Sequence, residues 1–155
     1  MPETKHSAAK DKLHSVRRYD LAAKEALAQY ESILSDITRI TPAYGGVHVK
    51  SSGGDDFSAG IERLREASSE ALLRYRQYAD AKAEAAEIIA AMGEWPDEMQ
   101  CLRLRYLDYR SNAGWRLTSW DEVAERMSVS RRQATNIHGQ ALRHFAEIWD
   151  KLPQA

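Results

Sequence analysis

The sequence predicts an all-α protein in which a long N-terminal helical hairpin precedes a C-terminal helix-turn-helix module. Apolar residues recur every three or four positions over two long segments, as on one face of a helix. Two serine-led helix starts lie eleven residues apart near the end of the chain. No stretch of useful length alternates apolar and polar residues as a β-strand would. We assign residues 1–95 to the hairpin and residues 96–155 to the module.

The first helix is expected over about residues 13–40. Its apolar side chains recur at spacings of three, four and seven: Val16, Ala23, Leu27, Tyr30, Leu34 and Ile37. Pro42 disfavours helical geometry in the residue before it and therefore predicts a stop. Residues 41–57 are rich in Gly, Ser and Asp, and so few apolar groups cannot offset the entropy of an ordered backbone. We therefore expect a flexible connector there.

The second helix is expected over about residues 58–92, packed antiparallel on the first so that the two apolar stripes cover each other. Its stripe averages about 3.5 residues per repeat, which is typical of a helical seam. The stripe consists of Ile61, Leu64, Ser68, Ala71, Tyr75, Tyr78, Lys82, Ala85, Ile89 and Met92. Ser68 and Lys82 interrupt it, so we expect moderate stability. Gly93 ends this helix.

A third helix is expected from Pro96, which suits a first helical turn, to about Arg110. It would bury Met99, Leu102 and Tyr106, with Leu107 at the margin. A turn at Ser111, Asn112 and Gly114 would follow.

The last segment has the pattern of a helix-turn-helix. Ser119-Trp120-Asp121-Glu122 predicts a capping box, in which the hydroxyl and the carboxylate each accept a hydrogen bond from a backbone N–H. A short helix over about Trp120–Met127 would follow. The turn Ser128-Val129-Ser130 places Val129 to fill the space between two helices. A second box, Ser130 to Gln133, starts a longer helix over about Arg131–Lys151. This arrangement is typical of DNA-binding modules.

A helical wheel divides the last helix into two faces. Ala134, Ile137, Ala141, Phe145 and Ile148 fall on the core side. The other side carries the candidate DNA-binding residues, which are Arg131, Arg132, Gln133, Asn136, Gln140 and Arg143. Arginine pairs with guanine, and Asn and Gln pair with adenine. The start of the helix suits phosphate. Gly139 also faces outward, where a missing side chain would let the helix approach a groove wall.

Charge is distributed unevenly along a nearly neutral chain. The net charge is −1, but the segment from Arg126 to Ala146 contains four arginines and no acidic residue. This basic patch is small for a nucleic-acid binder, so we expect self-association through the N-terminal helices to double it.

At these residues the chain resembles a known family. The stretch from Leu102 to Tyr106, then Ser119 to Ala124, and then Ile137-His138 and Ala141-Leu142 resemble the promoter-reading C-terminal domain of bacterial sigma factors. They resemble more closely small phage proteins of the ArpU and RinA type, regarded as late transcriptional regulators. The resemblance implies that the helix beginning near Arg131 is a recognition helix. One departure is Ala134, where a larger aliphatic residue is usual; it bears on helix packing rather than on DNA contact.

Other classes of function find little in the sequence. No nucleophile, base and orienting acid are placed together, so we expect no enzyme activity and no cofactor. We expect no metal site, because His138 and His144 are six positions apart, and His138 suits a packed histidine. The single cysteine, Cys101, is expected to be a small buried side chain or without a role. The single thiol and the absence of a membrane-spanning apolar run predict a cytoplasmic protein with no membrane partner.

The sequence thus predicts a phage or prophage transcriptional regulator that binds specific double-stranded DNA, with RNA polymerase as a further candidate partner. A dimer would bind half-sites about 34 Å apart. Two alternatives stay open. A small terminase subunit, which packages DNA, would form a ring of many copies. A helical adaptor that contacts RNA polymerase would bind protein and no duplex.

Overall fold

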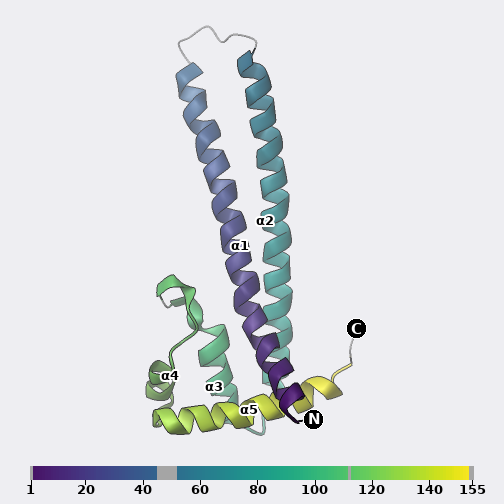
Figure 1. Ribbon diagram of the computed structural model, residues 1–155, viewed down its shortest axis with the longest axis vertical. Helices are drawn as coiled ribbons and strands as arrows, with labels where there is room; N and C mark the ends of the chain where they lie inside the picture. Colours follow the sequence, from purple (N-terminus) through teal and green to yellow (C-terminus); the bar gives the residue numbers. More distant parts are fainter. Residues whose placement is uncertain (1, 45–51, 112, 154–155) are drawn as a thin grey trace. The chain divides into compact units, whose positions relative to one another are not determined.

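The computed structural model describes residues 2–44, 52–111 and 113–153, and all regular structure within them is helical (Figure 1). The helices are α1 (Pro2–Tyr44), α2 (Ser52–Ala90), α3 (Pro96–Leu102), α4 (Trp120–Met127) and α5 (Arg131–Lys151). A π-helical segment, η1 (Arg103–Leu107), and two 3-10 turns, η2 (Tyr109–Ser111) and η3 (Ala113–Trp115), follow α3. The predicted all-α class with a long N-terminal helical hairpin is confirmed.

The chain divides into two compact units. Unit 1 comprises Met1–Arg18 and Tyr78–Ala155, and unit 2 comprises Tyr19–Gln77. Unit 1 therefore joins the start of α1 and the end of α2 to the whole of residues 96–155. The boundary drawn at residue 95 follows a change in sequence pattern, whereas the two units follow the spatial contacts of the chain.

All five helices contribute to the core of unit 1. Leu13 of α1, Ile89 of α2, Leu102 of α3, Val123 of α4 and Phe145 of α5 are each fully buried. Burying a side chain of this size contributes about 1.5–3 kcal/mol. The helix-turn-helix is thus built on the same core as the ends of the hairpin.

The beginning of α1 differs from the prediction. The helix begins at Pro2 rather than near residue 13. Ala9 is fully buried and continues the stripe of Leu13 and Val16 at helical spacing. The Nζ atom of Lys5 lies 2.9 Å from the Asp150 carboxylate of α5. Packing within unit 1 therefore orders a segment that looks merely polar in the sequence.

The predicted connector at 41–57 was too long. Residues 41–44 belong to α1 and residues 52–57 to α2, while residues 45–51 lie outside the described residues. Pro42 does not end α1, which continues to Tyr44; a proline in the last turn removes only one donor from a helix about to end. Asp56 lies near the start of α2, where an acidic group is favourable next to the helix dipole.

The third helix was also predicted too long. The α-helix ends at Leu102, and Asp108 N donates to the Arg103 carbonyl oxygen at 2.9 Å, five residues back. Arg105 Nη1 donates to the Thr118 carbonyl oxygen, which holds the returning chain against η1. Gly114 has a φ of 69°, in the left-handed region that favours glycine. The hydrogen bond between Arg105 and Thr118 joins residues 13 positions apart, so no local sequence pattern predicts it.

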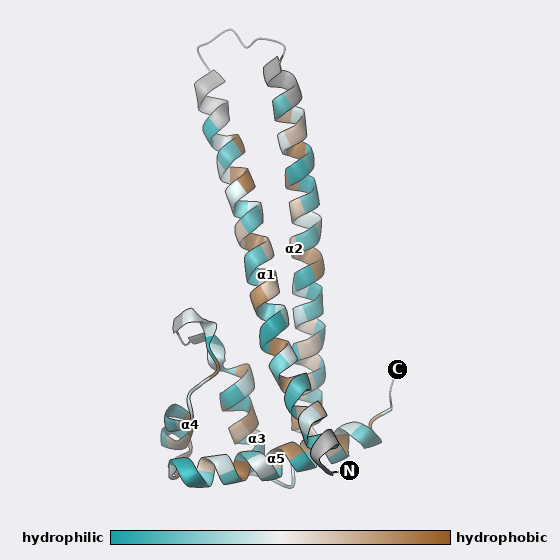
Figure 2. Cartoon of the chain, in the orientation of Figure 1, coloured by the Kyte–Doolittle hydropathy of each residue, from teal (hydrophilic) through white to brown (hydrophobic). Residues whose placement is uncertain are grey.

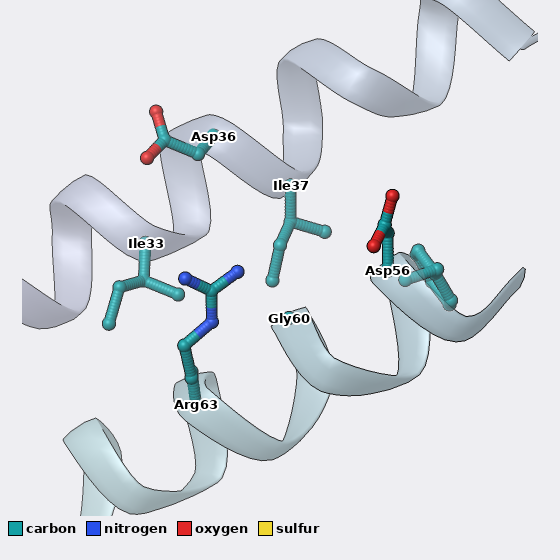
Figure 3. Close-up of a pocket in the computed structure, with 7 residues that line it drawn as sticks. Ile33, Asp36, Ile37, Asp56, Gly60 and Arg63 are labelled. Atoms are coloured by element: carbon teal, nitrogen blue, oxygen red, sulfur yellow. The ribbon is translucent and has the colours of Figure 1, made fainter. Parts of the chain in front are cut away.

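In unit 2, α1 and α2 approach closely at Gly60. A Cβ atom there would lie 3.4 Å from Ile37 Cγ1. Figure 3 shows Ile33 and Ile37 of α1 directed toward Gly60 and Arg63 of α2, around a cavity of about 50 Å³. Such a cavity has room for a few waters and not for an organic ligand.

Within the described residues, no helix combines the length and the apolar character needed to cross a bilayer.

Candidate DNA-binding surface

Helices α4 and α5 have the bounds predicted from the sequence and are joined by the turn Ser128–Ser130. Ser128 ends α4 in the left-handed conformation, with φ 58° and ψ 40°. Val129 N donates to the Ala124 carbonyl oxygen at 3.0 Å, and the Val129 side chain is partly buried against α4 and α5. Val129 thus fills the space between the two helices, as expected.

The two predicted capping boxes differ. At α5, Ser130 Oγ accepts a hydrogen bond from Gln133 N at 3.1 Å, and Gln133 Oε1 accepts one from Ser130 N at 3.0 Å. At α4, Ser119 Oγ accepts from Glu122 N at 3.2 Å. The Glu122 carboxylate, however, accepts from Arg126 Nη2 at 2.8 Å, so the predicted box at α4 is only half present. A Glu–Arg pair one helical turn apart competes with the cap for the carboxylate.

Small side chains bring α3, α4 and α5 together. Cys101, Val123, Ala124 and Ala134 form a buried cluster, and Ala134 is completely enclosed. Cys101 Sγ lies 3.8 Å from the Ala134 carbonyl oxygen. Burial raises the pKa of the Cys101 thiol to about 12, so the sulfur stays protonated and unreactive. The small side chain at position 134 therefore allows α5 to pack closely on α3 and α4.

The outward face of α5 presents the predicted residues to solvent. Figure 2 shows the beginning of α5 in hydrophilic colours. Six side chains on this face are exposed: Arg131, Arg132, Gln133, Asn136, Gln140 and Arg143. A face of this kind offers guanidinium and amide groups to a partner without prior unfolding.

Acidic residues of α4 offset part of the basic patch. Arg126 pairs with Glu122 at 2.8 Å, and Arg131 Nη1 lies 3.6 Å from Asp121 Oδ1. The structure records no ion pair between Arg132 and any other described residue, and the same holds for Arg143. The positive charge that remains without a counterion is therefore centred on Arg132 and Arg143.

Gln133 takes part in the cap as well as in the candidate surface. Its Oε1 atom is engaged by the Ser130 backbone N–H. Reading adenine needs both the amide oxygen and the amide nitrogen. Asn136, one turn further along and exposed, has no such engagement with the described residues, which makes it the better placed amide.

A groove of about 700 Å³ runs beside this face within unit 1. One wall is the first turn of α1, with Lys5 and His6. The other wall is α5, including Asn136, Gln140 and Arg143. The hydrogen bond to Asp150 raises the pKa of Lys5, which therefore keeps its charge.

Lys5 and His6 precede the predicted start of the first helix near residue 13, so the sequence did not predict them as part of this surface. The spacing of Ala9, Leu13 and Val16 was the signal that could have extended the first helix to this point. That these two side chains meet α5 follows only from tertiary contacts.

His138 lies on the inner side of α5. Its Nε2 atom is 2.7 Å from Tyr106 Oη, and its ring packs edge-on against Trp120 with centroids 4.7 Å apart. Burial, with a further contribution from the Arg105 charge, lowers the pKa of His138 to about 3. The neutral ring is a packing and hydrogen-bonding element that fixes α5 against η1.

His144 has a separate partner. Its Nδ1 atom lies 2.6 Å from Oε2 of the buried Glu98, and its ring stacks on Trp95 with centroids 3.8 Å apart. Within the described residues, no group of three or more His, Cys, Asp or Glu side chains is placed to hold a metal ion.

No protein-family model matches the chain, and neither a curated protein nor a solved structure gives a significant match.

Proposed function

We propose that the chain is a phage or prophage transcriptional regulator that binds double-stranded DNA through α5, in the manner of the ArpU and RinA type proteins it resembles. One observation carries the proposal. A capped helix that follows a short helix and a three-residue turn presents an exposed face of arginine and amide side chains.

The chemistry of this face suits a duplex more than a protein partner. Between Arg126 and Ala146 there is no acidic side chain to repel phosphate. Arg132 and Asn136 lie in the first turns of α5, the part of a recognition helix that contacts base edges. Arg143 lies about 18 Å from Arg131 along the helix axis. This length exceeds the width of a major groove, which is about 12 Å, so the later turns of α5 would reach the sugar-phosphate backbone.

Self-association is part of the proposal. Two of the four arginines are offset by Glu122 and Asp121, so one module provides few phosphate contacts. Leu72 and Leu73 of α2 are 57% and 50% exposed in unit 2. Two copies joined through such side chains would double the basic surface and give a two-fold binding site.

The test is selection of bound duplexes from a random pool, followed by gel retardation with the selected and a scrambled sequence. The double variant Arg132→Ala, Asn136→Ala is expected to lose the preference between the two while keeping its far-UV circular dichroism. Each lost base contact is worth about 1–3 kcal/mol of discrimination.

A matched control uses the exposed Arg76 and Gln29 of unit 2, since it removes one guanidinium and one amide elsewhere. Arg76→Ala, Gln29→Ala is expected to keep the sequence preference. The absence of any retardation of duplex by the wild-type chain at low salt would reject DNA binding and favour the adaptor alternative.

A further inference from the structure

The groove between α1 and α5 brings a second segment of the chain to the candidate surface. Lys5 and His6 line the groove on the α1 side. The α5 side is lined by Asn136, Gly139, Gln140 and Arg143. A Cβ atom on Gly139 would have no neighbour within 4 Å, so this stretch of the groove is open. Both walls therefore meet any partner that covers the middle of α5.

The position of the groove along α5 indicates what it meets. The beginning of a recognition helix contacts bases, and the later turns approach the sugar-phosphate backbone. The groove begins at Thr135 and extends to Glu147, so it covers these later turns. A strand of the duplex that lies against Arg143 would also pass the first turn of α1.

The ion pair of Lys5 is suited to exchange. Its Nζ atom lies 2.9 Å from Asp150 Oδ2, and the two side chains are 66% and 52% exposed. An exposed pair of this kind contributes little to stability. Asp150 thus holds the ammonium group beside the groove, and a phosphate can replace it as the counterion.

We propose that this groove seats a DNA phosphate, with Lys5 and His6 of α1 contacting the backbone beside Arg143. The proposal rests on the function proposed above. Glu147 and Asp150 limit the affinity in this arrangement, because both carboxylates lie close to the path of the strand.

The experiment measures duplex affinity at several salt concentrations for the full chain and two variants. Lys5→Gln is expected to bind severalfold more weakly, and the slope of log affinity against log salt should become shallower by about 0.9, the value for one lost phosphate contact. Asp150→Asn is expected to bind severalfold more tightly, because it releases Lys5 and removes a negative charge.

The two variants separate contact from tethering. Both break the Lys5–Asp150 pair. If that pair served only to hold α1 on α5, the two variants would shift affinity in the same direction, and this result would overturn the proposal. An unchanged affinity in both variants would also overturn it. Arg76→Gln, which removes one exposed positive charge from unit 2, is the control and is expected to bind as the wild type; an effect equal to that of Lys5→Gln would again overturn the proposal.

The two proposals fail in different ways. If the wild-type chain binds no duplex, the proposed function itself fails. If the wild type binds with a sequence preference that depends on Arg132 and Asn136, but Lys5→Gln leaves the salt slope intact, only the role of the groove fails.

Discussion

Tyr106 Oη lies 2.7 Å from His138 Nε2, and this contact ties the π-helical segment η1 to the middle of α5. Burial raises the pKa of Tyr106 to about 12, so the phenol keeps its proton and can donate it to the neutral imidazole. Trp120 of α4 packs against the same imidazole. The inner side of the candidate recognition helix is thus fixed by a polar contact, and its outer side is left to solvent.

Stability should depend on pH through His138. Its pKa is about 3 in the folded chain, against an ordinary value of 6.5. Between these values the unfolded chain binds a proton that the folded chain does not, so stability is fully present above pH 6.5 and falls as the pH drops toward 3. We expect the free energy of unfolding, measured in urea, to fall by a few kcal/mol from pH 7 to pH 4. His138→Gln should flatten this profile, whereas Gln29→Ala, at an exposed site of unit 2, should keep it.

Ala134→Leu should destabilise the helix-turn-helix. Ala134 is fully enclosed by the cluster of Cys101, Val123 and Ala124, so the added carbons have no space without a shift of α5. Overpacking of this kind costs about 1–3 kcal/mol, which thermal denaturation would detect. Thr135→Leu, at the exposed neighbouring position, is the control and should change the melting temperature little. A melting temperature equal to that of the wild type would show that the cluster has spare volume.

Gly139→Ala should affect stability and DNA binding in opposite directions. A Cβ atom at this position meets nothing within 4 Å, so the added methyl group is free of clashes. Replacing a mid-helix glycine by alanine stabilises a helix by about 0.5–1 kcal/mol. If α5 lies close to the wall of the major groove, the same methyl group should weaken duplex binding. The measurements are thermal denaturation and gel retardation, and a variant that is stabilised with unchanged affinity would remove Gly139 from the contact surface.

Replacing the exposed leucines of α2 should abolish self-association. Leu72→Glu, Leu73→Glu removes two large apolar side chains that solvent reaches in the single chain. We expect light scattering to give the mass of a dimer for the wild type and of a monomer for the variant, with an unchanged helical content. Ser58→Glu, at another exposed position of α2, should stay dimeric. A wild-type mass of many subunits would instead favour the ring expected of a small terminase subunit.

The bounds of α4 and α5 follow from the sequence because their start signals are local. Ser119 and Ser130 each accept a backbone N–H three residues ahead, and a hydroxyl at that spacing is visible in the chain itself. The apolar stripe of α5 is equally local, and Ala134, Ala141 and Phe145 are buried as the helical wheel requires. The all-α class and the outward position of Arg132 and Asn136 follow from the same periodicity.

Only the tertiary structure decided where distant segments meet. Ala9, near the start of the helix that begins at Pro2, is buried within unit 1, and a hydrogen bond from Arg105 to the Thr118 carbonyl oxygen spans the irregular turns after Leu102. The sequence also does not show which of two partners the Glu122 carboxylate takes. In the structure it pairs with Arg126 and not with the backbone N–H of the Ser119 cap. The groove that adds Lys5 to the surface of α5 also depends on tertiary structure, because Lys5 and its ion-pair partner Asp150 are far apart in the sequence. Periodicity and capping act within one or two helical turns, whereas these contacts are set by the folded core.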